Sequence, residues 1–193
     1  MLKNLFVSEV RLKILNLLLL KPEQEVHVRA IVREVDAEIN AVRRELNNLC
    51  NIEILLKRQS SNKIFYKANV LSPYFSELVS LLAKDSGIGK EIIKNKNNLG
   101  KVDFAILSLA FLKGRVSTPL DVDLFIVGEV NFDLISKIVK DYESKIKKEI
   151  NFSTMSSDEF LFRKRKNDSF IFRVLVQSRS MLIGDEEKFN SVA

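Results

Sequence analysis

The spacing of apolar residues changes within the first half of this chain, and that change most constrains its fold. In residues 7–20, Val10, Ile14, Leu17 and Leu18 recur at the interval that places them on one face of a helix. Residues 53–69 instead form two β-prone arms around the polar tip QSSN, which predicts a hairpin. Helices are expected at 7–20, 28–36, 37–50 and 72–84. The first part of the chain is therefore predicted to run helix, helix, helix, hairpin, helix.

Helix ends are suggested by residues that cap or interrupt the apolar pattern. Pro22 follows the first helix, and Asp36 is expected to cap the helix at 37–50. Ser72 is expected to cap the helix at 72–84, with Pro73 at its first position.

The second half alternates between short apolar runs and amphipathic stretches. Strands are expected at 101–110, 121–128, 149–155 and 181–185. Helices are expected at 131–148, from the Ser156–Glu159 capping box onward, and at 168–178. The segment DSGIGK at 85–90 is the best candidate for a domain boundary, so we predict domains at 1–86 and 87–193. The helices and strands expected in both domains predict an α+β protein.

Charge and cysteine content limit the classes of function. The chain carries a net charge of +6, and residues 39–70 hold six bases against two acids. An anionic partner is therefore compatible with this segment. Cys50 is the only cysteine, which excludes an intrachain disulfide and a cysteine-rich metal site. No apolar run is long enough to span a membrane, so we expect a cytoplasmic location.

The helix at 37–50 combines an apolar stripe with a polar one. Ile39, Val42, Leu46 and Leu49 make the stripe predicted to be buried, and the opposite stripe carries Asn40, Arg43, Arg44 and Asn47. Arginine can bind guanine and asparagine can bind adenine through two hydrogen bonds each in the major groove. The hairpin adds Arg58, Asn62, Lys63 and Lys67. The alternative is that Arg43 and Arg44 belong to an ordinary solvated helix face and bind no DNA. Arg44 could instead pair with Glu45 or Glu38.

This first part resembles the winged helix-turn-helix of arsenical-repressor-type regulators. The resemblance is carried by INAVRRELNNLCNIEILLKRQSSNKIFYKAN, which is similar to the recognition helix and wing of those proteins. It implies binding to double-stranded DNA as a homodimer, with the first helix and the helix at 72–84 as candidate dimer surfaces. Metal sensing through thiolates is not expected, because Cys50 and His27 stand alone.

Residues 101–185 resemble minimal nucleotidyltransferases related to the DNA polymerase beta palm. The resemblance is carried by AFLKGRVSTPLDVDLFIVGEV, in which Asp121 and Asp123 precede an apolar strand. It implies that these two carboxylates bind Mg²⁺, and that Lys113 and Gly114 lie near a bound nucleotide. The alternative is that the two acids only solvate the end of a strand.

Two departures from this pattern argue against catalysis. Leu109 and Ala110 occupy the place of the family's phosphate-binding Gly-Ser pair, and Asn151 occupies that of its third acid. Glu149 is an alternative source of that acid. The basic run RKRKND at 163–168 is expected to be a solvated helix end.

We therefore expect a DNA-binding transcriptional regulator with an inactive nucleotidyltransferase-like domain. The alternative is an active Mg²⁺-dependent nucleotidyltransferase that holds its substrate with the winged helix. A third possibility is an antitoxin-like or scaffolding protein.

Overall fold

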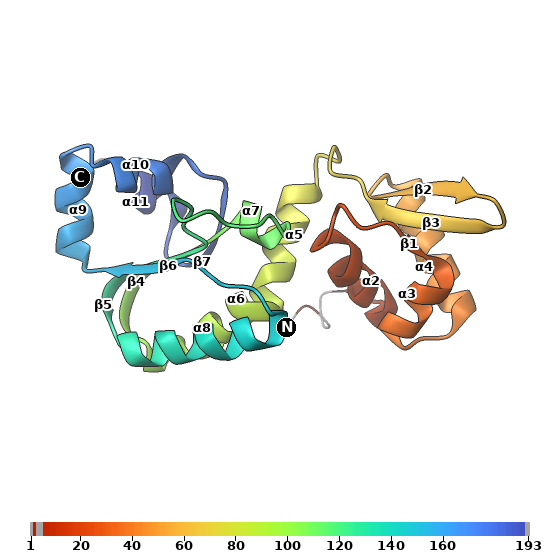
Figure 1. Cartoon of the computed structure of the whole chain (residues 1–193), viewed down its shortest axis with the longest axis horizontal. Helices are drawn as coiled ribbons and strands as arrows, with labels where there is room; N and C mark the ends of the chain where they lie inside the picture. The colour runs from red at the N-terminus through yellow and green to blue at the C-terminus, as the bar shows by residue number, and fades with distance from the viewer. Residues whose placement is uncertain (1, 3–5, 192–193) are drawn as a thin grey trace. The chain divides into compact units, whose positions relative to one another are not determined.

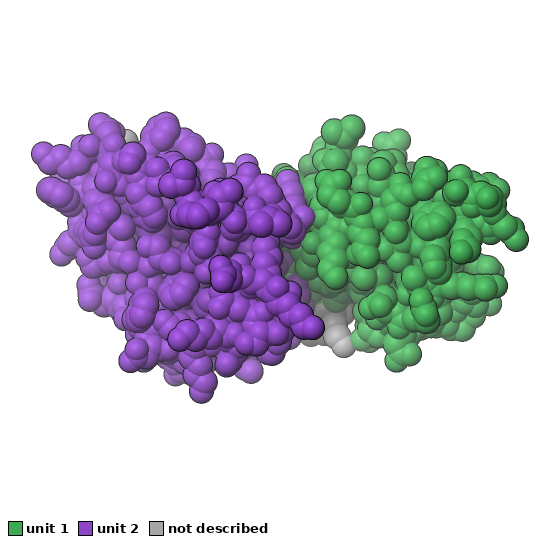
Figure 2. Space-filling view, viewed as in Figure 1, with its two compact units in different colours: residues 1–82 green, residues 83–193 purple. Residues whose placement is uncertain are grey.

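The computed structural model describes residue 2 and residues 6–191, and it separates into two compact units (Figures 1 and 2). Unit 1 comprises residues 1–82 and unit 2 residues 83–193. Helices with a small antiparallel sheet make up unit 1, and a mixed sheet with helices makes up unit 2, which confirms the α+β class. The domain boundary at residues 86 and 87 stays a prediction.

Unit 1 follows the predicted order of elements. Its elements are α2 (Glu9–Leu19), β1 (Val26–His27), α3 (Val28–Val35), α4 (Ile39–Asn51), β2 (Leu55–Ser60), β3 (Lys63–Ala68) and the start of α5 (Phe75–Asp85). The predicted hairpin is β2 and β3, and β1 adds a third antiparallel strand against β3. A strand of two residues leaves no periodic signal in the sequence.

Helix α2 packs apolar side chains into the core of unit 1. Helix α2 buries Leu12, Ile14, Leu15, Leu18 and Leu19. Each such side chain contributes roughly 1.5–3 kcal/mol when it is removed from water. Of the stripe predicted for this helix, Ile14 and Leu18 are buried and Val10 and Leu17 are only partly buried. A homodimer through this helix stays a prediction.

Two predicted helix starts are wrong. Glu38, not Asp36, caps α4, and its Oε2 accepts hydrogen bonds from the backbone N–H groups of Asn40 and Ala41 at 2.7 and 2.9 Å. Asp36 has a φ of 47° and ends α3 in the left-handed conformation, so it belongs to the preceding helix. Helix α5 begins at Phe75, after the turn that contains Ser72 and Pro73.

Unit 2 is built around a four-stranded mixed sheet in the order β6-β5-β4-β7. Its strands are β4 (Gly100–Ser108), β5 (Leu124–Val130), β6 (Phe152–Met155) and β7 (Arg179–Ile183). Only β5 and β6 run parallel. The helices are α6 (Gly87–Lys94), η1 (Lys96–Asn98), α7 (Leu109–Leu112), α8 (Phe132–Ile146), α9 (Ser157–Arg165), α10 (Ser169–Val176) and α11 (Glu186–Asn190).

Alternating side chains of the central strands fill a separate core on each face of this sheet. Leu124 and Ile126 of β5 join the core under α6 and α8, whereas Phe125 and Val127 join the core under α9, α10 and α11. Figure 1 shows these two helical layers on opposite faces of the sheet. The sheet is therefore covered on both sides, which explains why its strands have nearly continuous apolar runs.

Helix α9 begins as predicted, and it ends at Arg165, within the run at 163–168 that was expected to be a helix end. Ser156 caps it by accepting a hydrogen bond from the backbone N–H of Glu159 at 3.2 Å. The expectation that residues 163–168 are a solvated helix end is wrong for Lys164. Its Nζ is buried and donates to the carbonyl oxygens of Phe189 and Ser191, at 2.6 Å each. Within the described part of the chain, none of the helices is suited by length and apolarity to cross a membrane.

Candidate nucleic-acid interface

Helix α4 presents its polar stripe to solvent as the sequence suggests. Val42, Leu46 and Leu49 are buried. The side chains of Asn40, Arg43, Arg44 and Asn47 are exposed. Ile39 differs from its prediction, because it is only partly buried. Among the described residues, no ion pair joins Arg44 to Glu45 or Glu38.

Glu45 is a buried acid that the sequence pattern does not reveal. It is 4% exposed, and its Oε2 accepts a hydrogen bond from Nε of Arg11 on α2 at 2.8 Å. Burial raises the pKa of Glu45, but hydrogen bonds from Arg11 and Ser8 more than offset this, so the pKa lies below its ordinary value. Glu45 thus links α4 to α2 from the inner side of the helix.

A hollow of about 520 Å³ lies among α3, α4 and the β2–β3 hairpin. Four residues predicted to bind DNA line it: Arg43 and Asn47 from α4, and Asn62 and Lys63 from the hairpin. Asn40, Arg44, Arg58 and Lys67 are not among its lining residues. Of the described residues that do line it, none is an Asp or Glu. The hollow is therefore a cationic, hydrogen-bonding surface.

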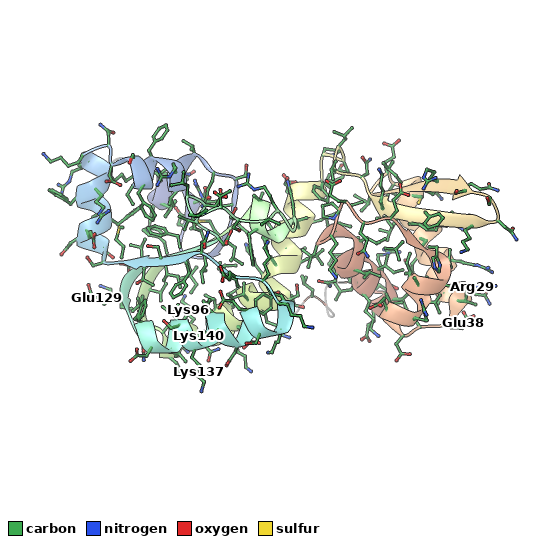
Figure 3. The ribbon with its side chains drawn as sticks, viewed as in Figure 1. Arg29, Glu38, Lys96, Glu129, Lys137 and Lys140 are labelled. Carbon is green, nitrogen blue, oxygen red and sulfur yellow. The ribbon has the colours of Figure 1, made fainter. Side chains whose placement is uncertain are left out.

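Arg29 is a further lining residue that the sequence did not single out. It is exposed, lies in the first turn of α3 and is labelled in Figure 3. A single arginine at a helix start has no distinguishing pattern, and only the packing of α3 beside α4 brings it to the hollow. It adds a third cation to Arg43 and Lys63.

Apolar and aromatic side chains also line the hollow. They are Val28, Ile39, Ile64 and Tyr66. Burial raises the pKa of the Tyr66 hydroxyl, Cys50 raises it further, and the positive charge of Arg43 acts in the opposite direction.

Arg58 and Lys67 belong to the other face of the hairpin. The register pairs Arg58 with Phe65, and Gln59 with Ile64. Directly paired residues share a face and neighbouring residues alternate, so Arg58 lies opposite Ile64. The Arg58 guanidinium lies over the Phe65 ring, 5.6 Å from its centroid.

Glu25 forms an ion pair with each of these two bases. Its carboxylate lies 2.6 Å from Nη2 of Arg58 and 4.0 Å from Nζ of Lys67. The hydrogen bond from Arg58 is the main reason that the pKa of Glu25 lies below its ordinary value. These two hairpin bases are therefore partly neutralised within the molecule.

His27 caps a helix, and Cys50 is partly buried. Nδ1 of His27 accepts a hydrogen bond from the backbone N–H of Ala30 at 3.3 Å and so caps α3. Cys50 is partly buried, and this burial raises the pKa of its thiol, which disfavours the thiolate. In the described ranges, no three His, Cys, Asp or Glu side chains are grouped so that they could hold a metal ion.

The two aspartates of unit 2 lie just before strand β5, not inside it. Strands β5 and β6 are parallel, and Leu124 pairs with Phe152. The preceding residues, Asp123 and Asn151, are therefore neighbours. The N–H of Asp123 donates to the carbonyl of Asn151 at 2.8 Å, and the N–H of Asn151 donates to Oδ2 of Asp123 at 2.9 Å. Asn151 thus lies beside Asp123, where the resemblance places a third acid.

Both carboxylates bind the loop that precedes them. Asp123 is 2% exposed, and its Oδ1 accepts from the Ser117 hydroxyl at 2.6 Å. Oδ1 of Asp121 accepts from Arg115 at 2.6 Å, and Oδ2 accepts from the N–H and hydroxyl of Thr118 at 2.8 Å each. The hydrogen bonds from Thr118 are the main reason that the pKa of Asp121 lies below its ordinary value.

Asn151 completes this loop arrangement through its amide. Its Nδ2 donates to the carbonyl of Thr118 at 2.7 Å. An ionised aspartate has no hydrogen to donate, so the amide performs a role here that the carboxylate cannot.

Helix α7 has a closed N-terminus where a phosphate cradle is expected from the resemblance. Leu109 is buried, and its N–H donates to the carbonyl of Ser178 at 2.9 Å. The Ser108 hydroxyl accepts from the N–H of Phe111 at 3.5 Å. Lys113 and Gly114 follow at the C-terminal end of α7, with Gly114 at a φ of 83°. The N–H groups of Leu109 and Phe111 are thus engaged inside the fold.

Comparison of the chain with protein-family models, with curated proteins and with solved structures finds no match.

Proposed function

We propose that this chain is a DNA-binding transcriptional regulator whose unit 1 is a winged helix-turn-helix. The single observation that carries the proposal is the hollow in which Arg43, Asn47, Asn62, Lys63 and Arg29 come together without an acid among the described lining residues. An acid-free cluster of arginine, lysine and asparagine side chains is suited to phosphate and base edges together.

Different residues have different roles in this proposal. Helix α4 enters the major groove, where Arg43 binds guanine and Asn47 binds adenine. Asn40 and Arg44 flank these two on the exposed face of the helix. Lys63 and Asn62 at the hairpin tip, and Arg29 on α3, bind phosphates and set the register. Arg58 and Lys67 contribute less, because Glu25 already holds them.

We propose further that unit 2 is nucleotidyltransferase-like and no longer transfers nucleotides. Three observations support this. The oxygens of Asp121 and Asp123 are engaged with the 115–118 loop and Asn151. Asn151, at the position where the resemblance expects a third acid, is an amide that donates to the carbonyl of Thr118. Leu109, at the position where the resemblance expects the Gly-Ser pair, is a buried leucine.

Selection from a random duplex library at a stated salt concentration tests duplex recognition. The account predicts an enriched motif that contains guanine and adenine. Two symmetric half-sites in that motif would support a homodimer, since paired half-sites reflect a two-fold protein assembly. A library without enrichment, together with binding that is equal for all sequences, contradicts the proposal.

A separate assay tests unit 2. The full chain is incubated with labelled ATP, CTP and GTP and Mg²⁺, and the mass of the protein and of added nucleic acid is measured. The proposal predicts no added nucleotidyl group. Transfer that disappears in Asp121→Ala would instead establish the active enzyme.

A further inference from the structure

Two isoleucines of unit 1 face the same hollow as the proposed DNA-binding side chains. Ile39 is the first residue of α4 and is partly exposed, and Ile64 of β3 is 42% exposed. Both line the hollow together with Arg43 and Asn47. Ile39, Arg43 and Asn47 are spaced by four residues, so they form one stripe along the helix.

Neither isoleucine has a use in binding phosphate. A β-branched aliphatic side chain offers no hydrogen bond and no charge, yet Ile64 is exposed and lines the hollow together with Arg29, Arg43 and Lys63. These three cations are complementary in charge to a DNA duplex, the occupant that the proposed function assigns to the hollow. In the major groove, the feature of a base edge that an aliphatic group can recognise is the 5-methyl group of thymine.

We propose that Ile39 and Ile64 bind the 5-methyl group of a thymine, next to the base that Arg43 contacts. This inference rests on the proposed duplex recognition and adds a thymine to the preferred sequence. Ile39 is well placed for this role, since the N-terminal residues of a recognition helix contact base edges. One methyl group enclosed by aliphatic side chains is worth about a fourfold change in affinity.

Replacement of thymine by deoxyuridine tests the proposal without altering the protein. Each thymine of the best selected duplex is replaced singly, which removes one methyl group and preserves every hydrogen bond. We expect wild-type affinity, measured by fluorescence anisotropy at fixed salt, to fall about fourfold at one thymine adjacent to the Arg43 contact, and to change little elsewhere.

Protein variants then assign the methyl contact. In Ile64→Ser, an exposed position on the hairpin, and in Ile39→Val, the loss caused by deoxyuridine should shrink. In Asn62→Ala, the matched control from the hairpin tip, the loss should remain about fourfold while overall affinity decreases. Such coupling between a protein side chain and a DNA methyl group is what a double-substitution cycle measures.

The deoxyuridine experiment distinguishes a failure of the isoleucine–thymine contact from a failure of duplex recognition. Sequence-specific binding that is unaffected by deoxyuridine at every position overturns the isoleucine contact alone. A methyl effect that persists unchanged in both isoleucine variants also overturns it. Absence of any duplex preference overturns both proposals.

Discussion

The carboxylate of Glu25 lies 2.6 Å from Nη2 of Arg58, on the face of the hairpin that carries Phe65. Lys67 reaches the same carboxylate at 4.0 Å. Glu25 therefore reduces the positive charge that the hairpin presents to a polyanion, whereas no Asp or Glu is among the described residues that line the hollow beside Arg29, Arg43 and Lys63.

Glu25→Gln should strengthen duplex binding. The substitution removes the ion pairs of Arg58 and Lys67, so one of these bases becomes available for a phosphate. We expect a gain in affinity of about twofold to fivefold at low salt, and a salt dependence steeper by up to about 0.9 in log–log slope. Titrations at several salt concentrations measure both.

Glu23→Gln is the matched control. Glu23 is exposed, and it forms no ion pair with any of the residues that the structure describes. An equal effect of the two substitutions would show that net charge alone, not the release of Arg58, alters binding.

Glu45→Gln should make unit 1 less stable and less sensitive to acid. Loss of the charge beside Arg11 is expected to lower the free energy of unfolding by about 1–3 kcal/mol at neutral pH. The pKa of Glu45 is lower in the folded chain, so its contribution is complete above about pH 4.3 and is lost as the pH falls through the folded-state pKa.

Urea unfolding of wild type and Glu45→Gln at several pH values checks this. The difference between the two proteins should be largest near neutral pH and should narrow below about pH 4.3. Glu34→Gln, at an exposed position of α3, should behave as wild type. A difference between wild type and Glu45→Gln that is constant across the whole range would contradict the assignment.

Asp123→Ala should destabilise unit 2, because the hydroxyl of Ser117 and the N–H of Asn151 lose their acceptor. The expected loss is about 1–3 kcal/mol, whereas Asp141→Ala, at an exposed position of α8, should change little. Thermal unfolding measures both.

Millimolar Mg²⁺ should leave the midpoint of wild-type thermal unfolding unchanged. A clear rise in that midpoint that disappears in Asp123→Ala would show that the carboxylates still bind the metal.

Lys164→Met should loosen helix α11. The carbonyl oxygens of Phe189 and Ser191 would lose a buried donor, which should lower the local stability of α11 by roughly 1–2 kcal/mol. Amide hydrogen exchange in residues 186–190 should therefore accelerate about tenfold. Lys166→Met is the control, because Lys166 is exposed. Equal exchange rates in the two variants would show that Lys164 does not stabilise α11.

Local patterns in the sequence predict the elements well and their ends poorly. Apolar periodicity locates α4 and its inward residues Val42, Leu46 and Leu49, because burial on one helix face is a local property. The cap of α4 is missed because aspartate is a preferred capping residue and glutamate is not, so residue type favours Asp36. In the structure Asp36 instead ends α3 with a left-handed backbone, and Glu38 caps α4.

Long-range pairing explains the parts of the site that the sequence did not reveal. Arg11 and Glu45 are 34 residues apart, and Arg58 and Glu25 are 33 apart. No local pattern indicates that such residues meet. The resemblance singles out Asn151, but the parallel register of β5 and β6 is what places it beside Asp123, and its hydrogen bond to Thr118 spans 33 residues.

The affinity of Arg43→Ala for the selected duplex tests the central claim most directly. Lys140→Ala of α8, labelled in Figure 3, removes the same charge from unit 2 and serves as the control. The account predicts that Arg43→Ala loses about 1–3 kcal/mol of binding free energy and its preference at one guanine, whereas Lys140→Ala keeps both. Equal affinity and unchanged base preference in Arg43→Ala would contradict duplex recognition by α4.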